Sequence, residues 1–452
     1  MNTVPRLLQD KVASGAFHNS SERYDPPKCH EGTREAIIEE ILDWIQDLDK
    51  HEFFLWLYGP AGAGKSAIAQ TIAEICSSLG LLAASFFFSR TARGRNNDTL
   101  LIPTLAYQLM ISIPETCEFI SAAIDTDPLI FTRSLEGQLE NLILQPLSHI
   151  FSHHRIEEFN TRPRLIIIDG LDECSHPNTQ HYVLTTLSSV VQRHGIPLNF
   201  LIASRPELEI REAFNQKSIT ALTRRLVLDD KYKPDADIKV FLTSKFVEIK
   251  DLHPLKSFLP VSWPSASDIK YLIQRSSGQF IYASTVMKYI ESPRHRPTER
   301  LKIVLGLTTP GKHIPFAELD AFYLHIFASV DDIEAVKEVL SFLLLFGFPK
   351  VQRRTEFVEN FFSYQSGDLQ ILLADLHSII SVPSPHQFFA ELQLFHTSLS
   401  DFLMDKSRSG SFFIDAPNAH ARLAKYCLNH INNFHGLQCK FTIIQIFQSI
   451  DN

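Results

Sequence analysis

The chain has 452 residues, 44% hydrophobic and 21% charged, which is enough for two to four folded domains. Its formal net charge of −8 disfavours a broad nucleic-acid-binding surface, and its apolar runs are too short to cross a membrane. Six scattered cysteines without a CxxC pair are typical of reduced thiols in a cytoplasmic protein. The N-terminus has no apolar core segment, so we expect no secretory signal.

Residues 1–27 are polar and end in Asp25-Pro26-Pro27, which predicts a linker or a partly ordered arm. The segment Cys29–Arg34 then leads into a helix. A metal site at Cys29 and His30 is not favoured, because no second pair of ligands is near. The buried face of the helix is predicted to hold Ile37, Ile38, Ile41, Leu42, Ile45 and Leu48.

The next segment predicts a phosphate-binding loop between a buried strand, Phe53–Tyr58, and a helix that starts at Ser66. Glycines that lack a Cβ let backbone N–H groups approach phosphate oxygens. Lys65 supplies a charge for the β- and γ-phosphates, and Ser66 supplies a hydroxyl for Mg²⁺. An ordinary glycine turn is the alternative, but the motif stands in the context that it requires. The nucleotide-binding residues expected here are Gly59, Pro60, Ala61, Gly62, Ala63, Gly64, Lys65, Ser66 and Ala67.

A second strand is predicted at Leu81–Phe88 and is followed by Arg90, Arg93 and Arg95. These arginines either face an anion or lie in a solvated loop, and charge runs favour the loop. Residues Leu100–Leu109 and Leu135–Ile150 then predict helices.

The segment Arg164–Ile168 predicts another buried strand, which ends on acidic residues. Asp169 occupies the position of an acid that holds Mg²⁺. Asp172 and Glu173 are placed to orient or deprotonate a water molecule aimed at the γ-phosphate. The alternative, a strand that merely runs into an acidic helix cap, loses weight because a phosphate loop lies upstream.

Two further strands are predicted at Leu198–Ala203 and Thr223–Leu228. Arg205, just after the first of them, either senses a γ-phosphate or is a surface arginine in a turn. Five strands that alternate with helices predict a doubly wound α/β domain, a P-loop NTPase sheet, at residues 28–230.

Beyond this domain the pattern becomes mostly helical. Residues 231–305 predict a small helical domain with helices at Ile238–Phe246, Ile269–Arg275 and Phe280–Ile290. Residues 306–415 predict a winged-helix domain, with helices at Ile333–Leu344 and Leu369–Ile380 and a hairpin between Ile379–Val382 and Glu391–Phe395. Residues 416–452, with an amphipathic helix at His420–Ile431, predict the start of a second helical domain.

Three of these features together resemble a NACHT domain: the phosphate loop, the acidic tail Asp169-Gly170-Leu171-Asp172-Glu173, and Ala203-Ser204-Arg205. NACHT domains are the nucleotide switches of NOD-like receptors, signal-transduction (STAND) ATPases of innate immunity. Further segments are similar to fungal NACHT proteins, so the resemblance covers about residues 28–452. These segments are Cys29–Arg34, Ser277–Ala283 and Phe395–Leu403.

The resemblance implies ATP or ADP with Mg²⁺ as ligands, and roles for individual residues. Lys65 and Ser66 bind phosphate and Mg²⁺, Asp169 is the Mg²⁺ acid, and Asp172, Glu173 and Arg205 act on the γ-phosphate. Thr33 and Arg34 are implied as nucleotide contacts, and His396 as a contact of the β-phosphate. From the residue alone, His396 is better explained as a core histidine, and only the resemblance makes the phosphate contact equally favoured. Many relatives have Gly-x-Pro where this chain has Gly278-Gln279-Phe280, so Phe280 is expected to pack on adenine.

The function predicted from these patterns is a nucleotide-dependent switch with slow ATP hydrolysis, in which water attacks the γ-phosphate. In the family that it resembles, ADP keeps the domains closed and ATP exchange permits homo-oligomers and partner proteins to assemble. One alternative is a scaffold that keeps ADP without hydrolysing it. A winged-helix regulator that binds DNA is a weaker alternative, because few basic residues cluster there.

Overall fold

The computed structural model describes residues 5–23, 26–60, 62–89, 92, 94–152, 164–194, 198–276, 278–291, 293, 296–305, 320, 323–324, 326–328, 330–345, 354–376, 379–383, 392–394 and 397–433. The chain divides into two compact units. The first holds residues 1–59 and 64–232, and the second holds residues 60–63 and 233–452.

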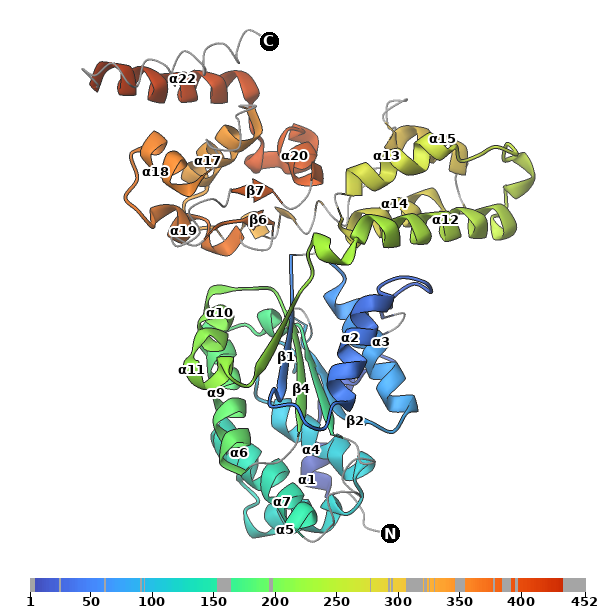
Figure 1. Ribbon diagram of the computed structural model, residues 1–452, viewed down its shortest axis with the longest axis vertical. Coiled ribbons are helices and arrows are strands. Elements are labelled where there is room, and N and C mark those ends of the chain that lie inside the picture. Colours follow the sequence, from blue (N-terminus) through green and yellow to red (C-terminus); the bar gives the residue numbers. More distant parts are fainter. Residues whose placement is uncertain are drawn as a thin grey trace. The chain divides into compact units, whose positions relative to one another are not determined.

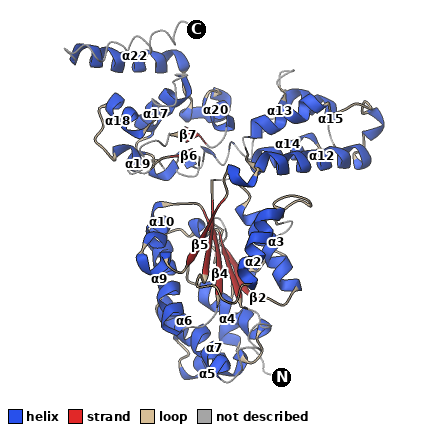
Figure 2. Ribbon diagram, viewed as in Figure 1, coloured by secondary structure: helices blue, strands red, loops and turns tan. Residues whose placement is uncertain are grey.

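A five-stranded parallel sheet forms the centre of the first unit, in the order β2-β3-β4-β1-β5. Four of the strands are short runs of mostly apolar residues, as expected for strands covered on both faces, whereas the edge strand β5 contains Arg224 and Arg225. The predicted P-loop NTPase α/β fold is confirmed, and Figure 2 shows the strands flanked by helices. The strands are β1 (Phe54–Tyr58), β2 (Leu82–Phe87), β3 (Leu165–Asp169), β4 (Asn199–Ser204) and β5 (Thr223–Val227).

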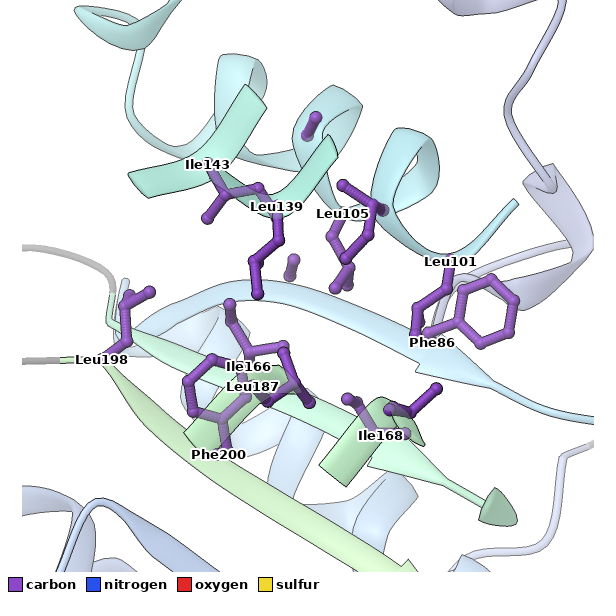
Figure 3. Close-up of a cluster of buried hydrophobic side chains, with 14 of the residues drawn as sticks. Phe86, Leu101, Leu105, Leu139, Ile143, Ile166, Ile168, Leu187, Leu198 and Phe200 are labelled. Carbon is purple, nitrogen blue, oxygen red and sulfur yellow. The ribbon is translucent and has the colours of Figure 1, made fainter. Parts of the chain in front are cut away.

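One face of the sheet carries the larger part of the core. Alternate residues of the strands, among them Phe86, Ile166 and Phe200, pack against helices and are almost fully buried. Figure 3 shows these side chains interlocking with Leu101, Leu105 and Ile143 of the covering helices. The helices on this side include α4 (Leu101–Ser112), α5 (Thr116–Thr126), α6 (Leu135–Leu139), the π-helical turn η3 (Glu140–Leu144), α7 (Gln145–Ser152), α9 (Pro177–His194), α10 (Leu208–Asn215) and α11 (Lys217–Thr220).

The opposite face is covered by α3 (Lys65–Ser78), which packs on β2, β3 and β4, and by α2 (Glu35–Gln46), which packs on α3 (Figure 1). The remaining alternate residues, such as Leu57, Ile167 and Leu201, are fully buried. Because Ile168 belongs to the first face, the neighbouring Asp169 points to the face that α3 covers.

Residues 5–23, where the sequence predicts a linker or a partly ordered arm, pack against the sheet and helices of the first unit. We call residues 5–23 the N-terminal strap. It contains α1 (Arg6–Gln9) and the short η1 (Ser14–Ala16), and its Leu8 and Ala16 are 0% exposed. The Ala13 N–H donates to Thr104 Oγ1 of α4 at 2.9 Å. Few apolar residues anchor this polar segment, which is why its composition suggested an arm.

The edge of the sheet at β2 is occupied by side chains rather than by another strand. The Gln108 side chain of α4 accepts from the Ser85 N–H at 3.0 Å and donates to the Ser85 carbonyl oxygen at 2.8 Å. The strap continues along the same strand, since the His18 N–H donates to Ser85 Oγ at 3.0 Å.

The second unit is mostly helical and holds two hydrophobic clusters. The first cluster is built by α12 (Pro234–Leu252), α13 (Ala266–Ser276), α14 (Phe280–Ile290) and α15 (Pro297–Val304). The second includes α17 (Ile333–Leu345), α18 (Thr355–Phe362), α19 (Asp368–Leu372), η8 (Ala374–Leu376), β6 (Ile380–Ser381), β7 (Gln393–Leu394), α20 (Thr397–Leu403), α21 (Lys406–Ser409), η9 (Gly410–Phe412) and α22 (Ala416–Asn433).

The antiparallel pairing of β6 with β7 confirms the predicted hairpin strands, whereas one predicted helix is too long. The apolar spacing from Leu369 suggested one helix to Ile380, but α19 ends at Leu372 and Ile380 lies in β6. Apolar residues three or four positions apart mark one face of a helix, but the same spacing can continue by chance where the chain leaves the helix and enters a strand. The division of this unit into a helical domain, a winged helix and a second helical domain stays a prediction. None of the described helices is long and apolar enough to cross a membrane.

We predict that Leu8→Ala lowers the free energy of unfolding by about 2–4 kcal/mol, because it leaves a cavity under the strap. Urea-induced unfolding of the full chain measures this loss. Leu7→Ala is the matched control, since Leu7 is 49% exposed, and it should change stability little. Equal effects of the two substitutions would show that the strap is not docked in solution.

Candidate nucleotide site

The phosphate loop connects β1 to α3, and its backbone conformation explains its glycines. Gly62 and Gly64 have φ of 74° and 94°, in the left-handed region that favours glycine. At Gly59 a Cβ atom would lie 3.0 Å from Leu228 Cβ, so a larger residue would crowd the end of β5. α3 begins at Lys65, whose Nζ donates to the Gly59 carbonyl oxygen at 2.8 Å. The lysine therefore folds back over the loop.

An acidic turn follows β3 at the same edge of the sheet. Gly170, with φ of 70°, donates its N–H to the Ala203 carbonyl oxygen at 2.8 Å and directs the chain into η4 (Leu171–Glu173). Gln180 of α9 is 4% exposed and donates to the Cys174 carbonyl oxygen at 2.9 Å. These bonds hold the backbone that carries Asp172 and Glu173.

Arg205 follows β4 and binds this turn through two contacts with Asp172. Its backbone N–H donates to Asp172 Oδ1 at 3.0 Å, and its Nε lies 3.2 Å from Asp172 Oδ2. The two side chains are 13% and 4% exposed, so water screens the pair weakly. The preceding Ser204 is held by Trp56 of β1, whose Nε1–H donates to Ser204 Oγ at 2.9 Å. Arg205 is thus a buried ion-pair partner and not a surface arginine in a turn.

The predicted charged residues converge on Lys65. Burial lowers the pKa of Lys65 to about 8, and the negative charges of Asp172, Asp169 and Glu173 oppose this shift while Arg205 adds to it. Four residues that follow two different strands therefore act on one ammonium group. Such a set of buried unlike charges at the carboxyl edge of a parallel sheet is where an α/β fold binds a ligand.

Asp169 is 5% exposed, and burial raises its pKa to about 7. A hydrogen bond with Ser66 opposes the shift, so the two predicted Mg²⁺ ligands are in contact. A hydroxyl and a carboxylate are hard oxygen ligands that suit Mg²⁺, which takes few protein ligands and completes its shell with phosphates and water. Among the described residues there is no group of three or more His, Cys, Asp or Glu side chains that could hold a metal ion.

Other sequence-predicted contacts are placed by the structure but not tested by it. Thr33 and Arg34 are 2% and 5% exposed ahead of α2, and Arg34 has φ of 59°, uncommon for a residue other than glycine. Ala67 lies in the first turn of α3. Phe280 starts α14 in the second unit, near Phe241. Their contacts with a nucleotide stay predictions, and Ala61, His396, Arg90 and Arg93 lie outside the described residues.

Sequence reasoning missed Arg23 of the N-terminal strap. Burial lowers its pKa to about 10, and the charge of Asp169 is the largest effect that opposes the shift. Arg95, which the sequence favoured as part of a solvated loop, is partly buried and its charge also acts on Arg23. No local motif marks Arg23; only the docking of the strap brings it to the site.

We predict that the buried Asp169 lowers the stability of the nucleotide-free protein as pH rises from 5 to 8. Unfolded Asp169 would titrate near pH 4, so between about pH 4 and pH 7 the folded state holds a proton that the unfolded state releases. Asp169→Asn removes this penalty. The change in Tm that this substitution causes should therefore be more positive at pH 8 than at pH 5, by a few °C, when both are measured in EDTA.

The matched control for this experiment is Asp43→Asn on the exposed side of α2. It should leave the pH dependence of Tm as in the wild type. If Asp169→Asn behaves in the same way as this control, Asp169 does not titrate in the folded protein as its burial indicates.

The comparisons with known proteins give one family-model match and distant structural likenesses. A family model described as Nephrocystin 3, N-terminal, matches residues 32–205, less than half of the chain, from just before Thr33 to Arg205. Among curated proteins none matches.

A chain in the structure of Drosophila ORC bound to DNA is similar in structure. It has 13% sequence identity and a TM-score of 0.35, and the match covers 79% of this chain and 84% of that chain. The structure of C. elegans PCH-2 gives 10% identity, a TM-score of 0.31 and coverage of 67% and 72%. Likenesses of this size assign no activity to the chain.

Proposed function

We propose that the chain is an adenine-nucleotide switch of NOD-like receptor type, with ADP and ATP favouring different states. The observation that carries the proposal is the buried pair between Arg205 and Asp172 beside Lys65. Without a γ-phosphate, Asp172 neutralises Arg205. A γ-phosphate at Lys65 would be a competing anion for Arg205, and charge-assisted bonds of arginine to phosphate are strong. Exchange of ADP for ATP would therefore move Arg205 from Asp172 towards the γ-phosphate. The acidic turn that carries Asp172 would lose this contact.

The same contacts give separate roles to the two acidic residues. Both carboxylate oxygens of Asp172 contact Arg205, so Asp172 holds the sensor rather than a water molecule. Glu173 is partly exposed, and its charge acts on both Lys65 and Asp169. Glu173 is therefore the better candidate to accept the proton of the attacking water.

Lys65 and the loop N–H groups stabilise the charge that develops on the phosphates. Ser66 and Asp169 would hold Mg²⁺, which neutralises phosphate charge when bound. Gly59 and Gly64 keep the loop backbone close to the ligand, and Asp169 must lose its proton before it can bind a cation.

The finer parts of the proposal follow from the resemblance to NACHT proteins. ADP would hold the chain in an autoinhibited state, ATP would permit assembly into homo-oligomers that recruit partner proteins, and hydrolysis would be slow. The compartment proposed is the cytoplasm, where the free thiols of Cys76, Cys117, Cys174 and Cys427 would stay reduced.

The two contacts between Arg205 and Asp172 also allow a second candidate, a scaffold that keeps ADP and does not hydrolyse ATP. In that case Arg205 would stay on Asp172 when ATP binds, and the γ-phosphate would lack its sensor. Single-turnover measurements with Glu173→Gln distinguish the two functions. A switch loses its slow hydrolysis on this substitution, whereas a scaffold has no hydrolysis to lose.

We predict that Lys65→Ala lowers the affinity for ADP and ATP at least tenfold, since it removes a charge-assisted phosphate contact. Arg205→Gln should weaken a non-hydrolysable ATP analogue by about tenfold and ADP by much less, because only the analogue has a γ-phosphate. Isothermal titration calorimetry measures both affinities, and light scattering on the same samples measures the oligomeric state.

Lys217→Ala, at an exposed lysine of α11, is the control and should bind as the wild type does. The proposal is wrong if Lys65→Ala binds nucleotide normally. The switch mechanism is wrong if Arg205→Gln lowers the affinities for ADP and for the analogue equally. It is also wrong if the analogue leaves the oligomeric state of the wild type unchanged.

A further inference from the structure

The N-terminal strap passes around the β2 edge and ends on the α3 side of the sheet. His18 joins both elements, because its N–H donates to Ser85 Oγ of β2 at 3.0 Å and its carbonyl oxygen accepts from Gln70 Nε2 of α3 at 2.9 Å. The same Gln70 accepts from Arg23 Nη1 at 2.7 Å. Arg23 is therefore fixed at the end of a docked segment that lies outside the region matched by the family model.

The neighbours of Arg23 are also the neighbours of the predicted Mg²⁺ ligands. Its Cζ lies 3.6 Å from the centre of the Phe87 ring, and Phe87 pairs in register with Asp169. Residues in register on parallel strands point to the same face. Gln70 lies four residues after Ser66 on α3, so the two share one face of that helix. The guanidinium thus lies near the ends of β2 and β3, on the α3 face to which Asp169 points.

Arg23 retains donors for a ligand. A guanidinium has five N–H donors in a planar fork that suits phosphate oxygens. Within the part of the chain that the structure describes, its side-chain partners are one oxygen of Gln70 and the Phe87 ring. Arg95 adds a second positive charge nearby. Stacking on the ring and the bond to Gln70 fix the orientation of the guanidinium before a ligand arrives.

The strand order then places cations on two sides of Asp169. β3 lies between β2 and β4 in the sheet. Arg205 follows β4, Arg23 lies over Phe87 at the end of β2, and Asp169 ends β3 between them. A triphosphate bound at Lys65 would bring one more negative charge to this edge than a diphosphate does.

We propose that Arg23 is a second sensor of the γ-phosphate. Arg23 would approach this phosphate from the β2 side and so couple the N-terminal strap to the nucleotide. The inference rests on the proposed nucleotide site. Binding of a triphosphate would tighten the strap on the sheet through Arg23, while a diphosphate would not. The chain then carries its nucleotide state to its N-terminal segment by a direct contact.

The test measures the affinities of ADP and of adenylyl imidodiphosphate for the full chain. Arg23→Gln should weaken the triphosphate analogue about tenfold, since it removes one charge-assisted bond, and change ADP less than threefold. Arg23→Lys should recover part of the loss, because it keeps the charge. Hydrogen exchange of residues 5–23 provides a second readout: the analogue should slow exchange in the wild type and not in Arg23→Gln.

Arg6→Gln is the matched control, because it makes the same substitution at an exposed arginine of the strap, in α1. It should leave both affinities and their ratio as in the wild type. The inference is overturned if Arg23→Gln weakens both ligands equally, or if Arg6→Gln shifts the ratio as much as Arg23→Gln does. Wild-type protein that binds neither ligand would overturn the proposed function as well, whereas normal binding with an unchanged ratio in Arg23→Gln overturns only the role of Arg23.

Discussion

Burial of unlike charges close together is the constraint on which the first unit depends. Lys65, Asp169 and Asp172 all lie at the carboxyl edge of one sheet, and each would be costly to bury alone. Arg205 neutralises Asp172, while Glu173 and the two aspartates act on Lys65. The surrounding elements serve this arrangement, since Trp56 fixes the end of β4 and Gln180 fixes the acidic turn.

The same charges make this site costly to the stability of the protein when no nucleotide is bound. Burial moves the pKa of Asp169 up to about 7 and that of Lys65 down to about 8, so both groups would be more stable in water. A polyanion with its cation would bring a further opposite charge to each of the two groups. Ligand binding and folding stability are therefore linked in this unit, as in other proteins that retain unfavourable charges for function.

The parts of the fold that sequence reasoning predicted are those with a local signal. Four of the five strands are short, mostly apolar runs, and the phosphate loop has its glycines and lysine at fixed spacing. The acidic turn was found in the same way, because Asp169, Asp172 and Glu173 are close in sequence. By contrast, the pairing of Asp172 with Arg205 spans 33 residues, and the docking of Leu8 or Arg23 depends on surfaces made by β2, α3 and α4. Isolated apolar residues in a polar segment carry no periodicity, so the strap could not be distinguished from a linker. The end of α19 was missed for a related reason, since Ile380 fits a helical stripe but belongs to a strand.

The Gln108 amide on β2 limits how copies of the chain could join. An exposed edge strand offers a row of N–H and C=O groups to which a strand of another chain can add. Here the side-chain amide of Gln108 already binds both the N–H and the carbonyl oxygen of Ser85, and the His18 N–H of the strap donates to the Ser85 hydroxyl. Continuous β-sheet between protomers is therefore blocked at β2. Assembly that followed nucleotide exchange would have to join protomers through surfaces other than the β2 edge.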